Sequence, residues 1–158
     1  MPTLSIAVLT CSDTRTLEED TAGAALEQEC RLLGWDFRSR EVVEDNAEAI
    51  SLAIERLAGE AAVDVLLTCG GTGLGPRDVT PDVTREVCDY LVPGIPEAMR
   101  ALSLEVTHRA MLSRATCGVR GRTLVVNLPG SKKGATECFG FIADQLEHAR
   151  DMIAGGGH

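Results

Sequence analysis

Aromatic side chains are scarce in this sequence, and it has no long apolar run. Only 3% of the 158 residues are aromatic, and every uncharged apolar stretch is far shorter than a bilayer span, which needs about 20 residues. No basic segment precedes the first apolar run, and Asp13 soon interrupts it. We therefore expect no transmembrane helix, no export signal, no membrane partner and a cytoplasmic location.

Metal-binding and nucleophile motifs are also missing. The three histidines lack ligand spacing, and the six cysteines contain no C-x-x-C pair, which argues against a zinc ribbon or a redox dithiol. We expect most cysteines to be buried thiols and assign no metal to the histidines. The G-x-S-x-G pattern of a serine nucleophile elbow is absent as well, so hydrolysis of that type is not expected.

Positive charge is in deficit, with 15 basic against 24 acidic residues and a net charge of -9. Non-specific nucleic-acid binding depends on many Lys and Arg side chains, so no nucleic-acid partner is expected. The stretch from Arg100 to Lys133 is an exception, because it holds seven basic residues and the single acid Glu105. Such a basic island fits a small anionic ligand and fits a contact with an acidic neighbouring subunit equally well.

Apolar runs of strand length alternate with helical stripes along the chain. We predict main strands at 4–10, 35–43, 63–68 and 123–128, a short strand at 111–114 and a turn at 117–121. We predict five helices. The first carries Ala25 to Leu33, and the second is capped by Asp45 or Asn46 and ends near Gly59. The third runs from Thr80 as N-cap to about Tyr90, the fourth follows Pro96, and the last runs from Ala135 to Ile153. This alternation predicts an α/β protein, a three-layer α/β/α sandwich with a mostly parallel sheet. Residues 1–154 would form one domain and 155–158 a flexible tail.

Ligands of open α/β sheets bind beyond the carboxyl ends of the strands. Four loops meet that description, at 11–20, 44–46, 69–80 and 129–133. The loop at 69–80 contains the glycine-rich run from Gly70 to Gly75, whose amides could approach a phosphate in front of a helix N-terminus. It is not a P-loop, because Pro76 follows Gly75, and it comes two strands too late for a dinucleotide fingerprint. A tight connection without a ligand remains the alternative.

Several polar side chains flank these loops. Asp78 could hold a Mg²⁺ ion that bridges nucleotide phosphates, or cap the next helix. Asp45 would reach the same rim, with capping an equally good explanation. Asp13 and Asp20 bracket the first loop, and Asp20 is expected to cap a helix. Ser113-Arg114 and Ser131-Lys132-Lys133 offer hydroxyls and cations to an anion, although exposed basic residues are usually solvated surface.

The segment from Thr68 to Pro81, TCGGTGLGPRDVTP, resembles the central signature of the MogA/MoaB family of molybdenum cofactor biosynthesis proteins, which includes gephyrin-type G domains. Four further blocks match in the same order, so the resemblance covers nearly the whole chain. These blocks are Ser12-Asp13 with Asp20 to Gly23, Pro93-Gly94 through Arg100, Met111 to Arg114 with Gly118, and Asn127 to Ser131. The resemblance implies the molybdopterin-binding-domain fold and a homotrimer or homohexamer.

The resemblance also implies an activity, molybdopterin adenylyltransfer. Mg²⁺-ATP would give AMP to the terminal phosphate of molybdopterin, yielding adenylyl-molybdopterin and pyrophosphate. That phosphate is already ionised, so no strong general base is needed. By the same resemblance, Asp78 and Asp45 are the catalytic, metal-associated carboxylates. The implied ligand-binding residues are Ser12 and Asp13, then Gly70, Gly71, Thr72 and Gly73 around the nucleotide phosphates, and Ser113, Arg114, Pro129, Gly130 and Ser131 toward the pterin and its phosphate.

The sequence departs from the family pattern at three places. It reads PGSKKG at 129–134 where many relatives read PGSPKA, Cys69 stands where Thr is common, and Ala22 where Ser is common. The first departure leaves the pterin-side loop open to difference. Two other functions remain possible: a protein that binds molybdopterin without turnover, and a nucleotide-hydrolysing relative of competence-damage proteins.

Overall fold

Six strands form one sheet in the order β2-β1-β3-β6-β5-β4 in the computed structural model, which describes residues 2–156. β1, β2, β3 and β6 run parallel, while β5 is antiparallel to both β6 and β4. The strands are β1 (Ser5–Cys11), β2 (Asp36–Val43), β3 (Val65–Cys69), β4 (Tyr90–Leu91), β5 (Cys117–Arg120) and β6 (Thr123–Leu128). The expectation of a mostly parallel sheet is confirmed.

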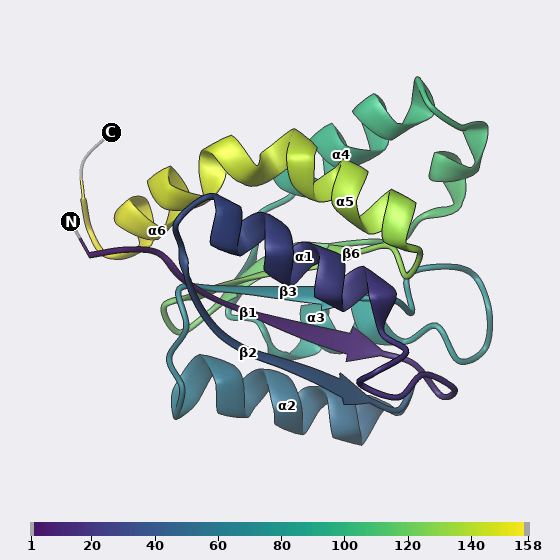
Figure 1. The fold of residues 1–158 in the computed structure, drawn as a ribbon, viewed down its shortest axis with the longest axis horizontal. Helices are drawn as coiled ribbons and strands as arrows, with labels where there is room; N and C mark the ends of the chain where they lie inside the picture. The colour runs from purple at the N-terminus through teal and green to yellow at the C-terminus, as the bar shows by residue number, and fades with distance from the viewer. Residues whose placement is uncertain (1, 157–158) are drawn as a thin grey trace.

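Helices cover both faces of this sheet (Figure 1). They are α1 (Thr21–Leu32), α2 (Ala47–Gly59), α3 (Thr80–Val87), α4 (Gly94–Leu104), α5 (Lys132–Ile142) and α6 (Leu146–Ile153), with 3₁₀ turns at His108–Leu112 and Ala143–Gln145. Along β1, Ile6 and Val8 pack toward α1 and α5, whereas Ala7 and Leu9 pack toward α2 and α3. This period-two alternation builds two apolar cores, one on each side of the sheet, and confirms the three layers. None of the helices in 2–156 has the length and apolarity needed to cross a bilayer.

Two local predictions in the second half of the chain are wrong. The segment predicted as a strand at 111–114 is not one: Met111 and Leu112 end the 3₁₀ turn His108–Leu112, and 113–114 follow it. Residues 117–120 of the predicted turn form strand β5. The chain reverses only at Gly121, whose φ of +61° is left-handed. Gly118 allows β4 to pair with β5, because a Cβ there would lie 2.8 Å from the Tyr90 carbonyl oxygen.

The closing helix is also interrupted. It divides into α5 and α6 at the 3₁₀ turn Ala143–Gln145, and α3 ends at Val87 instead of near Tyr90. We expect a flexible tail at 155–158. In its first two residues, the Gly155 amide donates to the Met152 carbonyl at 3.0 Å and the Gly156 amide to the Asp151 carbonyl at 2.7 Å. Residues 157 and 158 lie outside the described residues.

Helix caps decide between roles that the sequence leaves open. Asp20 accepts a 2.9 Å hydrogen bond from the Gly23 amide and caps α1 as predicted. Asn46, not Asp45, accepts from the Ala49 amide at 3.0 Å and caps α2. The N-cap position of α3 is Val79, so Thr80 is its first helical residue and the predicted Thr80 cap is wrong. Asp45 is therefore free for another role.

A buried polar network joins the sheet to α3 on the side that leads to the glycine-rich loop. The Asn127 side-chain amide donates to the hydroxyls of Thr68 and Thr84, at 2.9 and 3.0 Å, and its carbonyl accepts from the Thr116 amide at 3.2 Å. The Thr84 hydroxyl in turn donates to the Thr80 carbonyl at 2.9 Å. The network thus fixes the first turn of α3 against β3 and β6.

We expect Asn127→Ala to lower the free energy of unfolding by about 2–4 kcal/mol, because it leaves the buried Thr116 amide without an acceptor and opens a cavity. Chemical denaturation measures the loss. Gln28→Ala, on the exposed side of α1, is the control and should change stability by less than about 0.5 kcal/mol. Equal losses in the two variants would show that the buried network does not stabilise the fold.

Candidate functional site

The carboxyl ends of β1, β2, β3 and β6 meet at one edge of the sheet, as the parallel order requires (Figure 1). Hydrogen bonds tie the loops that leave these strands to one another. The Ser12 amide donates to Val43 at 2.9 Å, which joins the loops after β1 and β2. The Arg15 guanidinium donates to the Gly130 carbonyl at 2.7 Å, which joins the loops after β1 and β6. The Arg77 guanidinium donates to Asp13 at 3.0 Å and adds the loop after β3, so the four predicted loops form one connected rim.

Gly70 and Gly71 pass through this rim in left-handed conformations, with φ of +105° and +70°. A Cβ on Gly70 would lie 2.5 Å from the Cys11 carbonyl oxygen, and a Cβ on Gly130 would lie 3.3 Å from the Gly70 Cα. Only glycine combines this backbone with such close neighbours. The run from Gly70 is therefore a tight connection whose backbone requires glycine at these positions.

The amides of the loop divide into two kinds. The Gly70 amide donates to the Leu128 carbonyl at 3.0 Å and continues the sheet. Over residues 2–156, by contrast, the amides of Gly71, Thr72 and Gly73 donate no hydrogen bond to the chain. Of the four residues expected around a phosphate, three thus present free donors, whereas Gly70 shapes the turn.

Asp13 braces the rim from one side. Its carboxylate receives two hydrogen bonds from the Arg77 guanidinium, at 3.0 and 2.9 Å. It also accepts from the Asp45 amide at 3.0 Å, while its own amide donates to Asp45 Oδ2 at 3.1 Å. The hydrogen bonds from Arg77 hold the pKa of the Asp13 carboxyl below its usual value. Asp13 therefore links Asp45 to the loop that carries Arg77.

Asp45 and Asp78 lie on the same rim. The Asp45 Oδ1 atom is buried and has no hydrogen-bond partner among the described residues. Burial raises the pKa of Asp45, and the charges of Asp13 and Asp78 nearby act in the same direction. Asp78 Oδ2 accepts from the Gly75 amide at 2.8 Å, so Asp78 shapes the loop and does not cap α3. A cation between these carboxylates would relieve their repulsion.

The donor set fits a magnesium ion only together with a ligand. No group of three or more His, Cys, Asp or Glu side chains in residues 2–156 could hold a metal ion. Mg²⁺ commonly takes one or two protein carboxylates and completes its shell with phosphate oxygens and water. Asp45 and Asp78, beside free amides that suit phosphate, match that pattern.

Arg114 braces the glycine-rich loop from the opposite side. Its amide donates to the Thr72 carbonyl at 2.8 Å, its Nε to the Gly73 carbonyl at 3.0 Å and its Nη2 to the Asp78 carbonyl at 2.6 Å. The two terminal nitrogens also donate to both carboxylate oxygens of Asp82, at 3.0 Å each. The guanidinium is thus directed at the loop and α3. Direct contact with a pterin stays a prediction, whereas positioning of the loop follows from these bonds.

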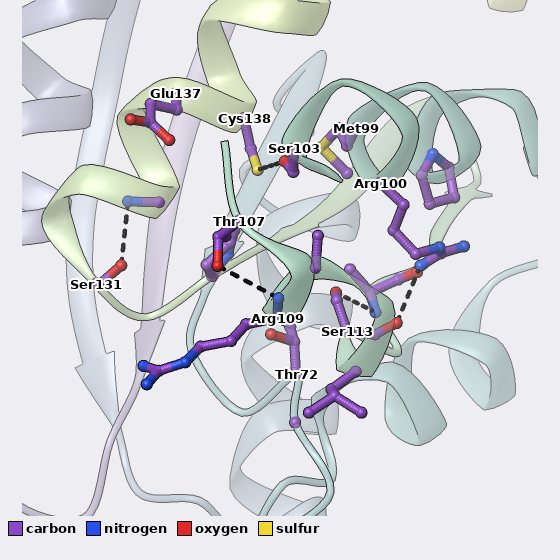
Figure 2. Close-up of a pocket in the computed structure, with 17 residues that line it drawn as sticks. Thr72, Met99, Arg100, Ser103, Thr107, Arg109, Ser113, Ser131, Glu137 and Cys138 are labelled. Carbon is purple, nitrogen blue, oxygen red and sulfur yellow. Dashed lines mark hydrogen bonds between the residues drawn. The ribbon is translucent and has the colours of Figure 1, made fainter. Parts of the chain in front are cut away.

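A cavity of about 470 Å³ opens beside the loop, between α4, the 3₁₀ turn His108–Leu112 and α5 (Figure 2). Five of the predicted ligand-binding residues line it: Thr72, Gly73, Ser113, Pro129 and Ser131. Met99, Ala110 and Leu112 add apolar wall. Thr72 and Gly73 belong both to this cavity and to the loop with free amides, so the two features adjoin.

Several of the predicted residues, including Pro129 and Ser131 of the cavity lining, also make hydrogen bonds that hold the rim together. The Ser12 hydroxyl accepts from the Arg15 amide at 3.1 Å and shapes the first loop. The Pro129 carbonyl accepts from the Cys69 thiol at 3.1 Å. The Ser131 hydroxyl caps α5 by accepting from the Gly134 amide at 3.0 Å. Ser12, Asp13, Asp45 and Asp78 stand outside the lining of the cavity.

Sequence reasoning missed the wall that α4, the 3₁₀ turn and the N-cap residue of that turn provide, which includes Arg100, Ser103, Thr107 and Arg109. The Arg100 guanidinium donates to the Ala115 carbonyl at 2.8 Å and supports the wall. Arg109 also lines the cavity, and within residues 2–156 its guanidinium forms no hydrogen bond or ion pair with the chain. The basic island was the available signal, but it did not separate Arg109 from the paired Arg114 and Arg120.

The chain is an α/β domain with a mostly parallel sheet, and the carboxyl edge of the sheet carries free amides, two carboxylates and an adjoining cavity. These features suit a phosphorylated ligand. Residues 7–148 match the family described as probable molybdopterin binding domain. The chain belongs to this family, which confirms the resemblance to molybdenum cofactor biosynthesis proteins.

Known relatives agree with this assignment. The chain is similar to the molybdopterin adenylyltransferase of Helicobacter pylori strain J99, with 35% identity over 98% of this chain and 90% of that protein. It is 38% identical over 97% of its length to the molybdenum cofactor synthesis protein cinnamon of Drosophila melanogaster, of which it spans only 26%. The crystal structure of the molybdopterin biosynthesis enzyme MoaB from Thermus thermophilus superposes with a TM-score of 0.88 at 39% identity, covering 96% and 97% of the two chains.

Arg114→Gln should lower the free energy of unfolding by about 1–2 kcal/mol, because it removes the ion pair with Asp82 and loosens the hydrogen bonds to the loop. Arg109→Gln is the matched control and should change it by less than about 0.5 kcal/mol. Chemical denaturation of both variants checks this, and equal losses would contradict a bracing role.

The same comparison has a pH dependence. The hydrogen bonds from Arg114 lower the pKa of Asp82 below its ordinary value of 3.8. The stabilisation is therefore fully present above that value and is lost as the pH falls through the lowered pKa. The difference in the free energy of unfolding between Arg114→Gln and Arg109→Gln should persist at neutral pH and become smaller only in strong acid.

Proposed function

We propose that this chain is a molybdopterin adenylyltransferase, which transfers AMP from ATP to the terminal phosphate of molybdopterin and releases pyrophosphate. One observation carries the proposal: the loop with free amides and the 470 Å³ cavity share Thr72 and Gly73. Two ligands, one on each side of this loop, would meet at the same backbone. That is the arrangement that a transfer between two phosphorylated substrates requires.

The nucleotide is assigned to the rim side of the loop. The amides of Gly71, Thr72 and Gly73 would donate to the triphosphate, and the N-terminus of α3 follows closely in the chain. Asp45 and Asp78 would hold a Mg²⁺ ion together with the phosphates. Bound Mg²⁺ supplies charge neutralisation at the phosphates as the leaving pyrophosphate develops negative charge.

Molybdopterin is assigned to the cavity. Met99, Ala110 and Leu112 offer apolar surface to the pterin, while Ser113 and Ser131 offer hydroxyls near the loop. The Arg109 guanidinium, which lines the cavity, would suit an anionic group of that ligand. In this assignment the terminal phosphate would lie toward Thr72 and Gly73, which line the same cavity.

The chemistry asks for positioning more than for proton transfer. An oxygen of the molybdopterin phosphate forms a bond to the α-phosphorus of ATP, and the bond from that phosphorus to the bridging oxygen breaks, so that pyrophosphate leaves. The attacking oxygen is already ionised, and none of the residues that line the cavity is a histidine. The rim residues therefore orient the two phosphates and stabilise charge through amides that are held in place beforehand.

The homotrimer or homohexamer implied by the family, and the cytoplasmic location, belong to this proposal as predictions. Large apolar side chains exposed on the edge strand β4 and on the 3₁₀ turn, including Tyr90, Leu91 and Met111, support an interface between copies of the chain.

Pyrophosphate release tests the function directly. Purified protein with Mg²⁺, ATP and molybdopterin should release pyrophosphate in step with adenylyl-molybdopterin, and ATP alone should give none. Binding of both ligands without pyrophosphate would favour the non-catalytic binder. Nucleotide consumption that does not need molybdopterin would favour the hydrolase.

Asp78→Asn should keep the fold and slow transfer by about 10²-fold or more, because a charge positioned for the phosphates is lost. The asparagine carbonyl can still accept from the Gly75 amide, so the loop stays in place. Steady-state rates measure the effect, with Glu97→Gln on the exposed side of α4 as the control. Near-normal turnover in Asp78→Asn would remove Asp78 from the mechanism.

Ser103→Phe should fill part of the cavity and raise the KM for molybdopterin by about 10-fold, while the KM for ATP changes by less than about 3-fold. The control is Ala101→Phe, which adds a larger side chain to the exposed side of α4. If both KM values rose together in Ser103→Phe, the cavity could not be the molybdopterin subsite alone.

A further inference from the structure

The side chain of Arg15 connects two loops that are not neighbours in the sheet. Arg15 lies in the loop after β1, and its Nη1 donates to the Gly130 carbonyl, in the loop after β6, at 2.7 Å. In the sheet, β3 lies between β1 and β6, and the glycine-rich run begins where β3 ends. The Arg15 side chain therefore passes beside the start of that run.

Two further observations place the Arg15 charge next to Gly70. Gly130 packs on Gly70, since a Cβ on Gly130 would lie 3.3 Å from the Gly70 Cα. Burial raises the pKa of the Cys69 thiol to about 12, the charge of Asp20 adds to the rise, and the charge of Arg15 opposes it. The guanidinium thus lies near the residues that lead into the free amides.

Arg15 differs from the other arginines that bind the rim loops. The guanidinium of Arg77 is paired with Asp13, and that of Arg114 with Asp82. Within residues 2–156, by contrast, Arg15 has no carboxylate partner, and its Nε and Nη2 donate no hydrogen bond. One edge of the guanidinium, formed by these two nitrogens, is therefore free.

This free edge is held in place and is open to a ligand. The Arg15 amide donates to the Ser12 hydroxyl at 3.1 Å, which fixes the backbone, and Nη1 is fixed by Gly130. The side chain is only half-buried. Gly130 stands between Pro129 and Ser131, which both line the cavity. Arg15 therefore lies between the loop with free amides and the wall of the cavity.

We propose that the Arg15 guanidinium binds phosphate oxygens where the two subsites meet. This inference rests on the proposed function and adds Arg15 to its phosphate-binding residues. Two N–H groups on one edge of a guanidinium suit a bidentate contact with phosphate. The rim already holds the carboxylates of Asp13, Asp45 and Asp78, so the approach of two phosphates requires positive charge that is not already paired. Arg15 supplies such a charge.

Equilibrium binding of two probes tests the inference without turnover. The first is α,β-methylene-ATP with Mg²⁺, measured by isothermal titration calorimetry. The second is purified molybdopterin, measured by the fluorescence of its pterin. Arg15→Gln should weaken the binding of at least one probe by about 10-fold or more, because a charge-assisted contact is lost, and the probe that is weakened identifies the phosphate.

The control is Arg38→Gln. Arg38 lies in the first half of β2, away from the carboxyl edge of the sheet, so this variant removes the same charge at a distance. It should change either affinity by less than about 3-fold. Wild-type affinity for both probes in Arg15→Gln would overturn the inference, and so would the absence of binding of both probes by the wild-type protein.

A second comparison separates phosphate binding from a role in tethering the two loops. Attraction to a phosphate is screened by salt, whereas a hydrogen bond to the Gly130 carbonyl has no such dependence on the charge of the ligand. The ratio of the wild-type and Arg15→Gln affinities should therefore fall as KCl is raised. A large ratio that is independent of KCl would assign Arg15 to tethering and overturn the inference.

If Arg15→Gln does not fold, Arg15→Lys and Arg15→Met decide, since their side chains have similar length and differ in charge. Tighter binding of a probe by Arg15→Lys supports the inference, and equal affinities overturn it.

These results are separable from the proposed function. Probe binding that depends on the Arg15 charge, in a protein that releases no pyrophosphate, would keep the inference and reject the transfer reaction. Pyrophosphate release by the wild type, together with unchanged affinities in Arg15→Gln, would keep the transfer reaction and reject the inference.

Discussion

The close approach of backbone segments at Gly70 and Gly71 is the constraint on which the site depends. Their left-handed conformations bring the loop after β3 against Cys11 at the end of β1 and against Thr80 of α3. A side chain at either position would push these segments apart. The free amides, the rim carboxylates and the cavity wall lie next to one another only because these two consecutive residues have no Cβ.

The sequence is sufficient to predict most of the sheet but not its antiparallel edge. β1, β3 and β6 are continuous apolar runs that are buried on both faces, so their pattern is unambiguous. β5 is only four residues long and contains Gly118, which also suits a turn. Its strand state depends on pairing with β6 and β4, and that pairing is a tertiary effect which no local pattern records.

Some features of the site can likewise be predicted from the sequence, and others cannot. Topology predicts that the four loops share one edge, because this follows from strand direction alone. The choice between Asp45 and Asn46 as helix cap is not predictable, since both residue types cap helices and they are adjacent. Only the backbone shows that Asn46 takes the position, and this choice leaves Asp45 Oδ1 unpartnered. Likewise, Arg114 has the chemistry of an anion ligand, but its acceptors lie more than 30 positions away in the sequence.

The bonds of Arg114 and Asp13 explain how a loop with unbonded amides can still be ordered. Arg114 holds the carbonyls of the loop, and Asp13 holds Arg77 at its far end. The loop is therefore fixed through its acceptors and side chains while its donors stay free. Donors fixed in this way need no reorganisation when a phosphate arrives, which is the condition for strong electrostatic stabilisation. Because Ser113 lines the cavity and Arg114 holds the loop, a single peptide bond connects the wall of one subsite to the geometry of the other.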